Sequence, residues 1–470
     1  GILSGVGASS DGRATSVYAP RPSGQAKALR RAYERAGYGP ETVELVEAHG
    51  TGTPAGDAAE FEGLSMVFGD ETDTDASRWC ALGSVKSQVG HTKAAAGAAG
   101  LFKAVMALHH KTLPPTIKVE RPNPKLNLTD GPFYLSTQVR PWVRGSDHPR
   151  RAGVSSFGFG GSNFHLAVEE YAAPAGEAFR APRMRTFPTE LLSFSEGSVE
   201  ALIAHLDTAI ELVGMEGGLA FVAQRSKRSF DPSKPHRASL VAKDAIDATA
   251  KLERLRKHLK STPEAELDAP GMFVGHGAAD GKLAFLFPGQ GSQYVSMGAE
   301  LAMAFDSAMA AWDVAADADM EGERLQHVVF PKPDFVEGSD EAKAARVKAT
   351  EWAQPGIGVA SAATLNVLRQ VGLQADAVAG HSFGEVTALY AAGTLNAQDF
   401  LAVARKRGEL MRDAAQTDGS MTAVQSDIAT LRGILGDRTD VVVANHNHPS
   451  QVVVSGPTAA VAAFEQQLTD

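Results

Sequence analysis

The 470-residue chain contains one cysteine, Cys80, so no disulfide can form within it, and a reducing cytoplasm is the expected compartment. No apolar run approaches the roughly 18 residues that a membrane-spanning helix needs. The first residues also lack the basic and apolar segments of a signal peptide. Acidic residues outnumber Lys and Arg by 55 to 45, which argues against a nucleic-acid-binding surface.

Glycine is abundant at 47 residues, and the length and 43% hydrophobic content suit roughly two to four α/β domains. Residues 1–171 alternate strand-like and helical stretches and form the first predicted domain. A shift toward Pro, Ala and Arg at 172–188 marks a boundary. We expect a small α/β linker domain over 172–280, which carries no catalytic motif. A further α/β domain is expected over 281–470, with a small subdomain from about 416. Both chain ends are interpreted as cuts through domains.

Within the last segment, the run KLAFLF (282–287) predicts a strand buried on both faces of a parallel sheet. Helical segments and short apolar strands are expected to alternate from there to about residue 415. Near the end, VVVA (441–444) and QVVVSG (451–456) predict two strands around the polar loop NHNHPS, followed by a helix.

The sharpest motif is Gly380-His381-Ser382-Phe383-Gly384, which follows the apolar run ADAVA and precedes the helical run EVTALYAAG. That strand–turn–helix context is the one a G-x-S-x-G nucleophile elbow requires. Ser382 would lie at a helix N-terminus, where unpaired backbone N–H groups and the helix dipole favour developing negative charge. The motif by itself also fits a glycine-rich turn with a chance serine.

Two further motifs accompany the elbow, namely FPGQGSQ (287–293) and Gln354-Pro355. Together the three resemble the malonyl-type acyltransferases of fatty-acid and polyketide synthases. The resemblance implies an α/β-hydrolase-like acyltransferase core, followed by the start of a ferredoxin-like subdomain.

The same resemblance implies a role for each matching position. Ser382 would be the acylated nucleophile, and the backbone N–H groups of Gln290 and Phe383 would form the oxyanion hole. His381 would line the pocket. Arg407 would pair with the carboxylate of a malonyl-type extender, because a guanidinium fits that planar anion; alone, Arg407 would be interpreted as a solvated charge on a helix.

A serine nucleophile needs a general base, and in this family the base is a histidine well downstream of the elbow. Only 88 residues follow Ser382, and His446 and His448 are the only histidines among them. Neither is assigned as the base, which is expected to lie beyond this chain together with the extender-specificity motif.

The first 171 residues carry three motifs that resemble, in order, the C-terminal half of a thiolase-fold ketosynthase. They are EAHGTGT (47–53), GSVKSQVGH (83–91) and RAGVSSFGFGGSNFH (151–165). Decarboxylative Claisen condensation needs groups that stabilise an enolate oxygen, and two histidines facing one cavity can do so. The resemblance gives these roles to His49 and His91, and it gives Lys86 an orienting and electrostatic role.

The condensing cysteine of such an enzyme would lie upstream of residue 1, and Cys80 is interpreted as a buried core thiol. A metal site that pairs a histidine with Asp57 is an alternative, but the combined motifs favour catalysis, and no metal is expected. A non-condensing relative would be expected to lose catalytic groups, whereas His49, Lys86 and His91 are all kept.

The predicted function is acyl transfer from a malonyl-type CoA to Ser382 and then to the phosphopantetheine thiol of an acyl carrier protein. A ketosynthase would use the product, and it would make the protein a homodimer. Several stretches, and Phe383 where modular synthases more often carry Gln, look more like iterative polyunsaturated-fatty-acid or enediyne-type synthases. A modular polyketide synthase remains an alternative, as do a serine hydrolase and a non-catalytic scaffold.

Overall fold

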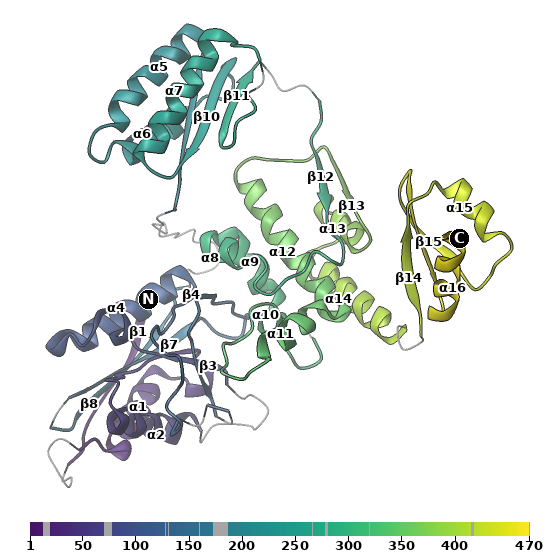
Figure 1. The fold of residues 1–470 in the computed structure, drawn as a ribbon. Helices are drawn as coiled ribbons and strands as arrows, with labels where there is room; N and C mark the ends of the chain where they lie inside the picture. The colour runs from purple at the N-terminus through teal and green to yellow at the C-terminus, as the bar shows by residue number, and fades with distance from the viewer. Residues whose placement is uncertain are drawn as a thin grey trace. The chain divides into compact units, whose positions relative to one another are not determined.

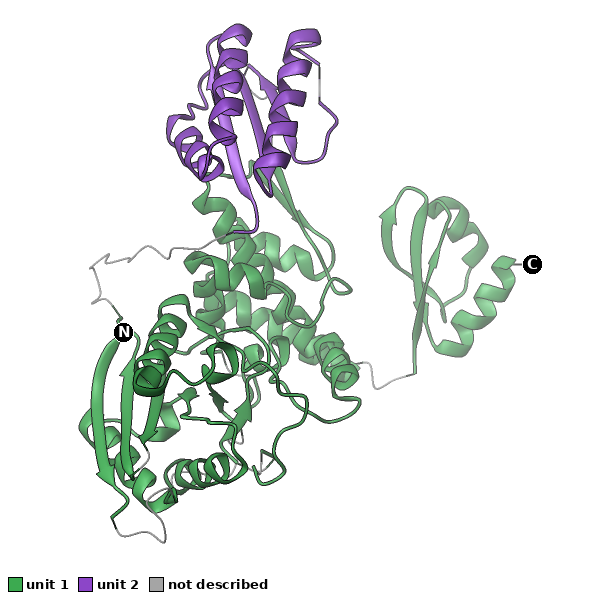
Figure 2. Ribbon diagram, turned by 60° about the vertical axis from the view of Figure 1, so that its left-hand side comes forward, with its two compact units in different colours: residues 1–179, 284–470 green, residues 180–283 purple. Residues whose placement is uncertain are grey.

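The computed structural model divides the chain into two compact units, one of Gly1–Phe179 with Ala284–Asp470 and one of Arg180–Leu283 (Figure 2). The structure describes every residue except 13–18, 70–77, 127, 130, 159, 173–186, 266, 278–280, 319, 415–417 and 470. The composition break predicted at 172–188 and the subdomain boundary predicted at about 416 therefore fall mostly outside the described residues.

The first part of the chain folds around a six-stranded mixed sheet in the order β1-β8-β7-β2-β3-β5 (Figure 1). The strands are β1 (Ile2–Ser10), β2 (Leu45–Glu47), β3 (Cys80–Gly83), β5 (Phe133–Leu135), β7 (Arg151–Gly158) and β8 (Ser162–Glu169). β2 runs parallel to both of its neighbours, β3 and β7, whereas β1, β8 and β7 pair antiparallel.

Helices cover both faces of this sheet. They are α1 (Pro22–Ala36), α2 (Pro54–Phe68) and α4 (Ala96–His110). Leu29 of α1 and Leu64 of α2 pack in one core cluster, and Leu108 of α4 packs in another. All residues of β2 and β3 are buried as a result, as expected for strands covered on both faces. Cys80 is fully buried in β3, in agreement with its interpretation as a core thiol.

The Arg180–Leu283 unit has its own antiparallel sheet, in the order β11-β10-β9. Its elements are β9 (Glu190–Glu196), α5 (Val199–Val213), α6 (Gly218–Ser229), β10 (His236–Ala242), α7 (Ala245–Ser261) and β11 (Met272–His276). Alternate strand residues such as Leu192 and Phe194 face a core shared with Leu252 and Leu255 of α7. The predicted strand, turn and helix in this segment are present as β9 and α5.

Two short parallel strands, β12 (Ala284–Phe287) and β13 (Ala377–Gly380), support the third part of the chain. The prediction that β12 is buried on both faces is wrong, because Leu286 is 77% exposed while Phe287 is buried. Phe287 packs with Leu365 and Ala388 on one face of the strand pair. Since side chains alternate along a strand, Leu286 points to the other face, which no described helix covers in this way.

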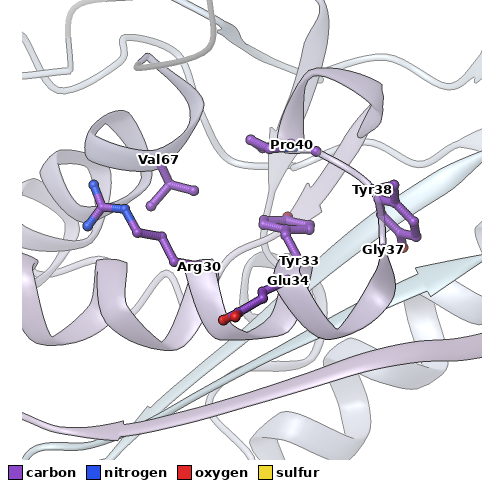
Figure 3. Close-up of a pocket in the computed structure, with 8 residues that line it drawn as sticks. Arg30, Tyr33, Glu34, Gly37, Tyr38, Pro40 and Val67 are labelled. Atoms are coloured by element: carbon purple, nitrogen blue, oxygen red, sulfur yellow. The ribbon is translucent and has the colours of Figure 1, made fainter.

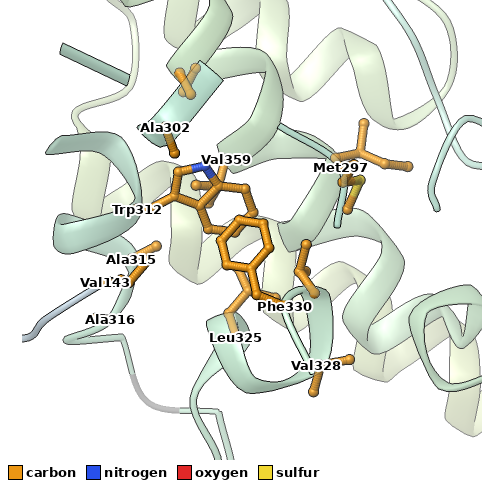
Figure 4. Packing of buried hydrophobic residues seen from close by; sticks show 14 of the residues in the cluster. Val143, Met297, Ala302, Trp312, Ala315, Ala316, Leu325, Val328, Phe330 and Val359 are labelled. Atoms are coloured by element: carbon orange, nitrogen blue, oxygen red, sulfur yellow. The ribbon is translucent and has the colours of Figure 1, made fainter. Parts of the chain in front are cut away.

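Helices rather than strands fill the chain between β12 and β13, so the predicted alternation is wrong for the residues described there. They are α8 (Ala299–Ala304), α9 (Asp306–Ala315), α10 (Leu325–Val329), α11 (Ser339–Lys348) and α12 (Thr350–Gln370), and α13 (Phe383–Ala391) and α14 (Ala397–Ala414) follow β13. Trp312 and Phe330 lie at the centre of their core, with ring centroids 4.5 Å apart (Figure 4). Burial of these large side chains stabilises the helical layer.

The last part of the chain has the βαββα order expected at the start of a ferredoxin-like subdomain. Its elements are β14 (Ser420–Val424), α15 (Ile428–Leu435), β15 (Val442–His448), β16 (Gln451–Gly456) and α16 (Thr458–Thr469), with the sheet order β14-β16-β15. The predicted loop NHNHPS is mostly strand, since β15 continues to His448, which pairs with Gln451. Only Pro449 and Ser450 make the turn. No helix among the described residues is long and apolar enough to cross a membrane.

Two candidate active sites

The first candidate site forms where β2 and β3 end. These strands are parallel, so the segments that follow them begin at the same edge of the sheet. His49 follows β2, and Lys86 and His91 follow β3 at the two ends of the short helix α3 (Lys86–Val89). The rings of His49 and His91 meet edge to face with centroids 5.4 Å apart. The structure therefore brings together the three residues that the sequence motifs singled out.

Glu60 on α2 anchors the loop that carries His49. Its carboxylate accepts hydrogen bonds from the backbone N–H of His49 at 2.7 Å and of Gly50 at 2.8 Å. Gly50 has φ +44°, and a Cβ there would lie 2.7 Å from the Cβ of Ser84, so only glycine fits this turn. Burial raises the pKa of Glu60 to about 7 against the opposing effect of these two N–H groups. Sequence reasoning missed Glu60, although a carboxylate on the buried face of a helix is a visible signal.

A second buried carboxylate, Glu47, ties the two loops together. It accepts the backbone N–H of Val85 at 2.5 Å, immediately before Lys86. It also forms an ion pair with Lys103 of α4 at 2.9 Å, and both side chains are less than 10% exposed. Charges this deeply buried are retained only when paired. The pair thus connects the end of β2, the start of α3 and helix α4.

Electrostatics keep both histidines of this site neutral. Burial lowers the pKa of His49 to about 4, with further lowering by Lys86 and His91. Burial and then Lys86 also lower the pKa of His91. The backbone N–H of Lys93 donates to Nδ1 of His91 at 3.0 Å, so a neutral His91 carries its proton on Nε2. Neutral imidazoles with a proton available can donate to a developing enolate oxygen.

The alternative metal site at Asp57 finds no support in the geometry. Asp57 accepts the backbone N–H of Gly52 at 3.1 Å within its own loop. The part of the chain that the structure describes contains no group of three or more His, Cys, Asp or Glu side chains that could hold a metal ion. The glycine-rich end of the third motif includes residue 159, which lies outside the described residues.

The histidine of that third motif, His165, has a structural environment. Its Nε2 contacts the Tyr33 hydroxyl at 2.9 Å, and its Nδ1 contacts the Ser155 hydroxyl at 3.0 Å. Burial lowers the pKa of His165 to about 3, so it stays neutral. A pocket of about 490 Å³ opens beside Tyr33 (Figure 3), and its lining includes none of the residues predicted to act in catalysis.

The second candidate site forms where β12 and β13 end, again as parallel neighbours. Ser382 is the N-cap of α13 and has φ +53° and ψ −110°, a strained conformation for a residue with a side chain. A Cβ on Gly380 would lie 1.9 Å from the backbone carbon of Gly384, and one on Gly384 would lie 2.1 Å from the Phe287 carbonyl oxygen. Both glycines of the elbow are therefore required by backbone contact.

Arg407 on α14 reaches the nucleophile. Its Nη2 donates to Ser382 Oγ at 3.3 Å, and its Nη1 donates to the side-chain oxygen of Gln354 at 2.7 Å. Gln354 is fully buried on α12. Arg407 is thus held at the serine and is not a solvated surface charge. A guanidinium in this position can pair with the carboxylate of a bound acyl group.

The remaining predicted residues of this site surround the elbow. A Cβ on Gly289 would lie 2.4 Å from the His381 carbonyl oxygen, so the loop carrying Gln290 packs directly against the elbow. α13 begins at Phe383, whose N–H belongs to the first turn, where N–H groups have no acceptor within the helix. The His381 side chain is exposed, and its Nε2 lies 3.3 Å from the amide oxygen of Asn447.

No histidine contacts the nucleophile within the described residues. There, Arg407 is the hydrogen-bond partner of Ser382 Oγ. His446 and His448 lie exposed on β15, and His448 contacts Ser450. Neither was assigned as the base, and their placement gives no reason to assign them now.

Comparison with known proteins matches both sites to their families. Residues 1–120 match the model of the beta-ketoacyl synthase C-terminal domain, 122–241 that of the ketoacyl-synthetase C-terminal extension, and 284–470 that of the acyl transferase domain. The chain is therefore a ketosynthase–acyltransferase region. More particularly, its relatives place it among the multidomain polyketide and polyunsaturated-fatty-acid synthases.

The polyunsaturated fatty acid synthase of Thraustochytrium sp. has a polypeptide that is 35% identical over 98% of this chain and 17% of its own length. Polyketide synthase GfsA of Streptomyces halstedii is 36% identical over 99% of this chain and 6% of its own length. The chain thus spans a small share of these relatives. A solved ketosynthase from module 6 of the bacillaene synthase of Bacillus subtilis is 32% identical, covers 59% of this chain and 47% of its own, and aligns with a TM-score of 0.36.

The elbow glycines generate a stability prediction. We expect Gly384→Ala to lower the thermal unfolding midpoint of the acyltransferase part by several degrees, because its Cβ would meet the Phe287 carbonyl and force the backbone apart. Gly433→Ala on α15 is the matched control, since no atom lies within 4 Å of its Cβ position. Alanine there should be neutral or stabilising by about 0.5–1 kcal/mol. Equal melting curves for wild type and Gly384→Ala would contradict the close contact.

Proposed function

We propose that the acyltransferase part accepts a malonyl-type acyl group from CoA on Ser382 and passes it to the phosphopantetheine thiol of an acyl carrier protein. The observation that carries this proposal is the guanidinium of Arg407 at 3.3 Å from Ser382 Oγ. A cation in that place favours acyl groups that end in a carboxylate. Backbone N–H groups of Gln290 and Phe383 would stabilise the oxyanion of the tetrahedral intermediate. His381 would line the acyl pocket.

We further propose that the ketosynthase part performs the decarboxylative Claisen condensation with His49, His91 and Lys86. Carbon dioxide leaves the malonyl thioester, and the resulting enolate oxygen accepts hydrogen bonds from the two neutral imidazoles. Lys86 supports this arrangement because its charge opposes protonation of either histidine. The thioester that the carbanion attacks would be carried by a cysteine outside these 470 residues.

The setting that we propose for this region is a cytoplasmic synthase that dimerises through its ketosynthase and works with an acyl carrier protein. The buried, single thiol of Cys80 is compatible with a reducing compartment. We propose the iterative type on the sequence features given above, and the similarity to the Thraustochytrium polyunsaturated fatty acid synthase supports it. The similarity to polyketide synthases of comparable identity keeps the modular type as the alternative.

The acyltransferase proposal is tested first at Ser382. In the full-length synthase, malonyl-CoA should leave a malonyl mass increase on the peptide that contains Ser382, and Ser382→Ala should abolish it. Ser426→Ala serves as the control, because Ser426 lies at the start of the C-terminal subdomain and its hydroxyl contacts only Asp427. Labelling that persists in Ser382→Ala would refute the assignment of the nucleophile.

Arg407 decides which acyl groups are accepted. Its charged bidentate contact with a carboxylate is worth roughly 1.5–3 kcal/mol, so Arg407→Ala should lower malonyl transfer relative to acetyl transfer by about 10- to 150-fold. The exposed Arg432 on α15 provides the control substitution Arg432→Ala. Equal losses for the two acyl groups would show that Arg407 has only a structural role. Unselective hydrolysis of simple esters would indicate a serine hydrolase instead.

The ketosynthase histidines should affect condensation but not loading. In the full-length synthase, His49→Ala or His91→Ala should block decarboxylative condensation while acylation of the upstream cysteine continues. Because the pKa of His49 is lowered to about 4, the neutral form is present above that pH and is lost only as the pH falls through about 4. Condensation should therefore show no acid limb from His49 near its ordinary pKa of about 6.5. A variant that condensed at the wild-type rate would identify its histidine as structural, and His258→Ala is the control.

A further inference from the structure

Thr350 joins two parts of the acyltransferase site that the sequence motifs treat separately. It is the first residue of α12, and its hydroxyl accepts a hydrogen bond from the side-chain nitrogen of Gln354 at 2.8 Å. The same hydroxyl donates to the side-chain oxygen of Gln290 at 3.0 Å. Gln354 in turn accepts Arg407 at 2.7 Å. One continuous row of hydrogen bonds therefore runs from the cation beside Ser382 to the loop that follows β12.

Hydrogen-bond chemistry gives this row a single direction. Arg407 can only donate, so the oxygen of the Gln354 amide must face it and the nitrogen of that amide must face Thr350. A hydroxyl that accepts from Gln354 has one proton to donate, and that proton goes to the oxygen of Gln290. The orientation of each amide is thus determined by the charge at the other end. Removing the hydroxyl would leave the nitrogen of a fully buried amide without this partner.

Helix packing holds Arg407 and Thr350 in place. A Cβ on Gly408, the neighbour of Arg407, would lie 2.7 Å from the carbonyl oxygen of Thr350, so α14 touches the first turn of α12 through backbone atoms. Arg405 adds a hydrogen bond from Nη1 to the Glu351 carbonyl at 3.1 Å. These contacts bring α12 and α14 together at the residues that support the cation (Figure 1).

We propose that Thr350 is a positioning residue that aligns Arg407, through Gln354, for acyl groups that carry a carboxylate. The same hydroxyl couples that alignment to Gln290 on the oxyanion side of the site. This inference rests on the proposed acyltransferase function. It assigns a role in selectivity to a residue that touches neither the nucleophile nor the predicted position of the substrate.

The test compares Thr350→Val, which keeps the shape and removes the hydroxyl, with Thr350→Ser, which keeps the hydroxyl. In the full-length synthase, kcat/KM for acylation of Ser382 is measured with malonyl-CoA and acetyl-CoA. Loss of one hydrogen bond should lower the malonyl-to-acetyl ratio about 2- to 12-fold in the Val variant, mainly through a higher KM for malonyl-CoA. The Ser variant should keep the wild-type ratio. Thr364→Val on the same helix is the matched control, because the Thr364 hydroxyl contacts only its own helix at Ala360.

The proposal is overturned if Thr350→Val lowers both substrates equally, if Thr350→Ser behaves like Val, or if Thr364→Val changes the ratio as much. If the Val variant does not fold by its melting curve, Thr350→Ala is measured in its place with the same criteria. The two levels of inference fail differently. A wild-type synthase that does not label Ser382 contradicts the acyltransferase function. An unchanged ratio in Thr350→Val, with a ratio lowered by Arg407→Ala, contradicts only the role of Thr350.

Discussion

Parallel pairing of two neighbouring strands is the constraint on which both candidate sites depend. β2 pairs with β3, and β12 pairs with β13, each in parallel register. Parallel strands start their following segments at one edge of the sheet, one strand spacing of about 4.8 Å apart. His49 therefore meets His91, and the loop of Gln290 meets the elbow of Ser382, although each pair comes from separate stretches of sequence. The remaining features of each site adjust side chains that this pairing has already brought together.

Buried polar groups make those adjustments. A carboxylate or amide in the interior is stable only with its hydrogen-bonding capacity used, so each one fixes the segments that supply its partners. Glu47 and Glu60 consume the backbone N–H groups of Val85, His49 and Gly50, and thereby shape the loops on both sides of the ketosynthase histidines. The motif residues are held mainly from behind, through the backbone.

The motifs revealed the reactive residues because backbone geometry restricts them. Gly380 and Gly384 are required by contacts that any Cβ would break, so the elbow was visible as a pattern of glycines. Glu60, Gln354 and Thr350 left weaker signals, because their partners depend on how whole helices pack and rotate. The extension of β15 through His448 was missed for another reason. β15 is an edge strand, where exposed polar side chains are favourable, so NHNH resembled a loop.

Each site places a cation beside its reacting group, and the proposed roles of the two cations differ in a way that their surroundings explain. Lys86 lies near two imidazoles, so its effect on them is to oppose their protonation. Arg407 donates to a neutral hydroxyl and a neutral amide, neither of which balances its charge. An acyl group that brings a carboxylate supplies the missing charge, whereas an acetyl group leaves it unpaired. Selectivity would then come as much from the cost of that unpaired charge as from attraction to the malonyl group.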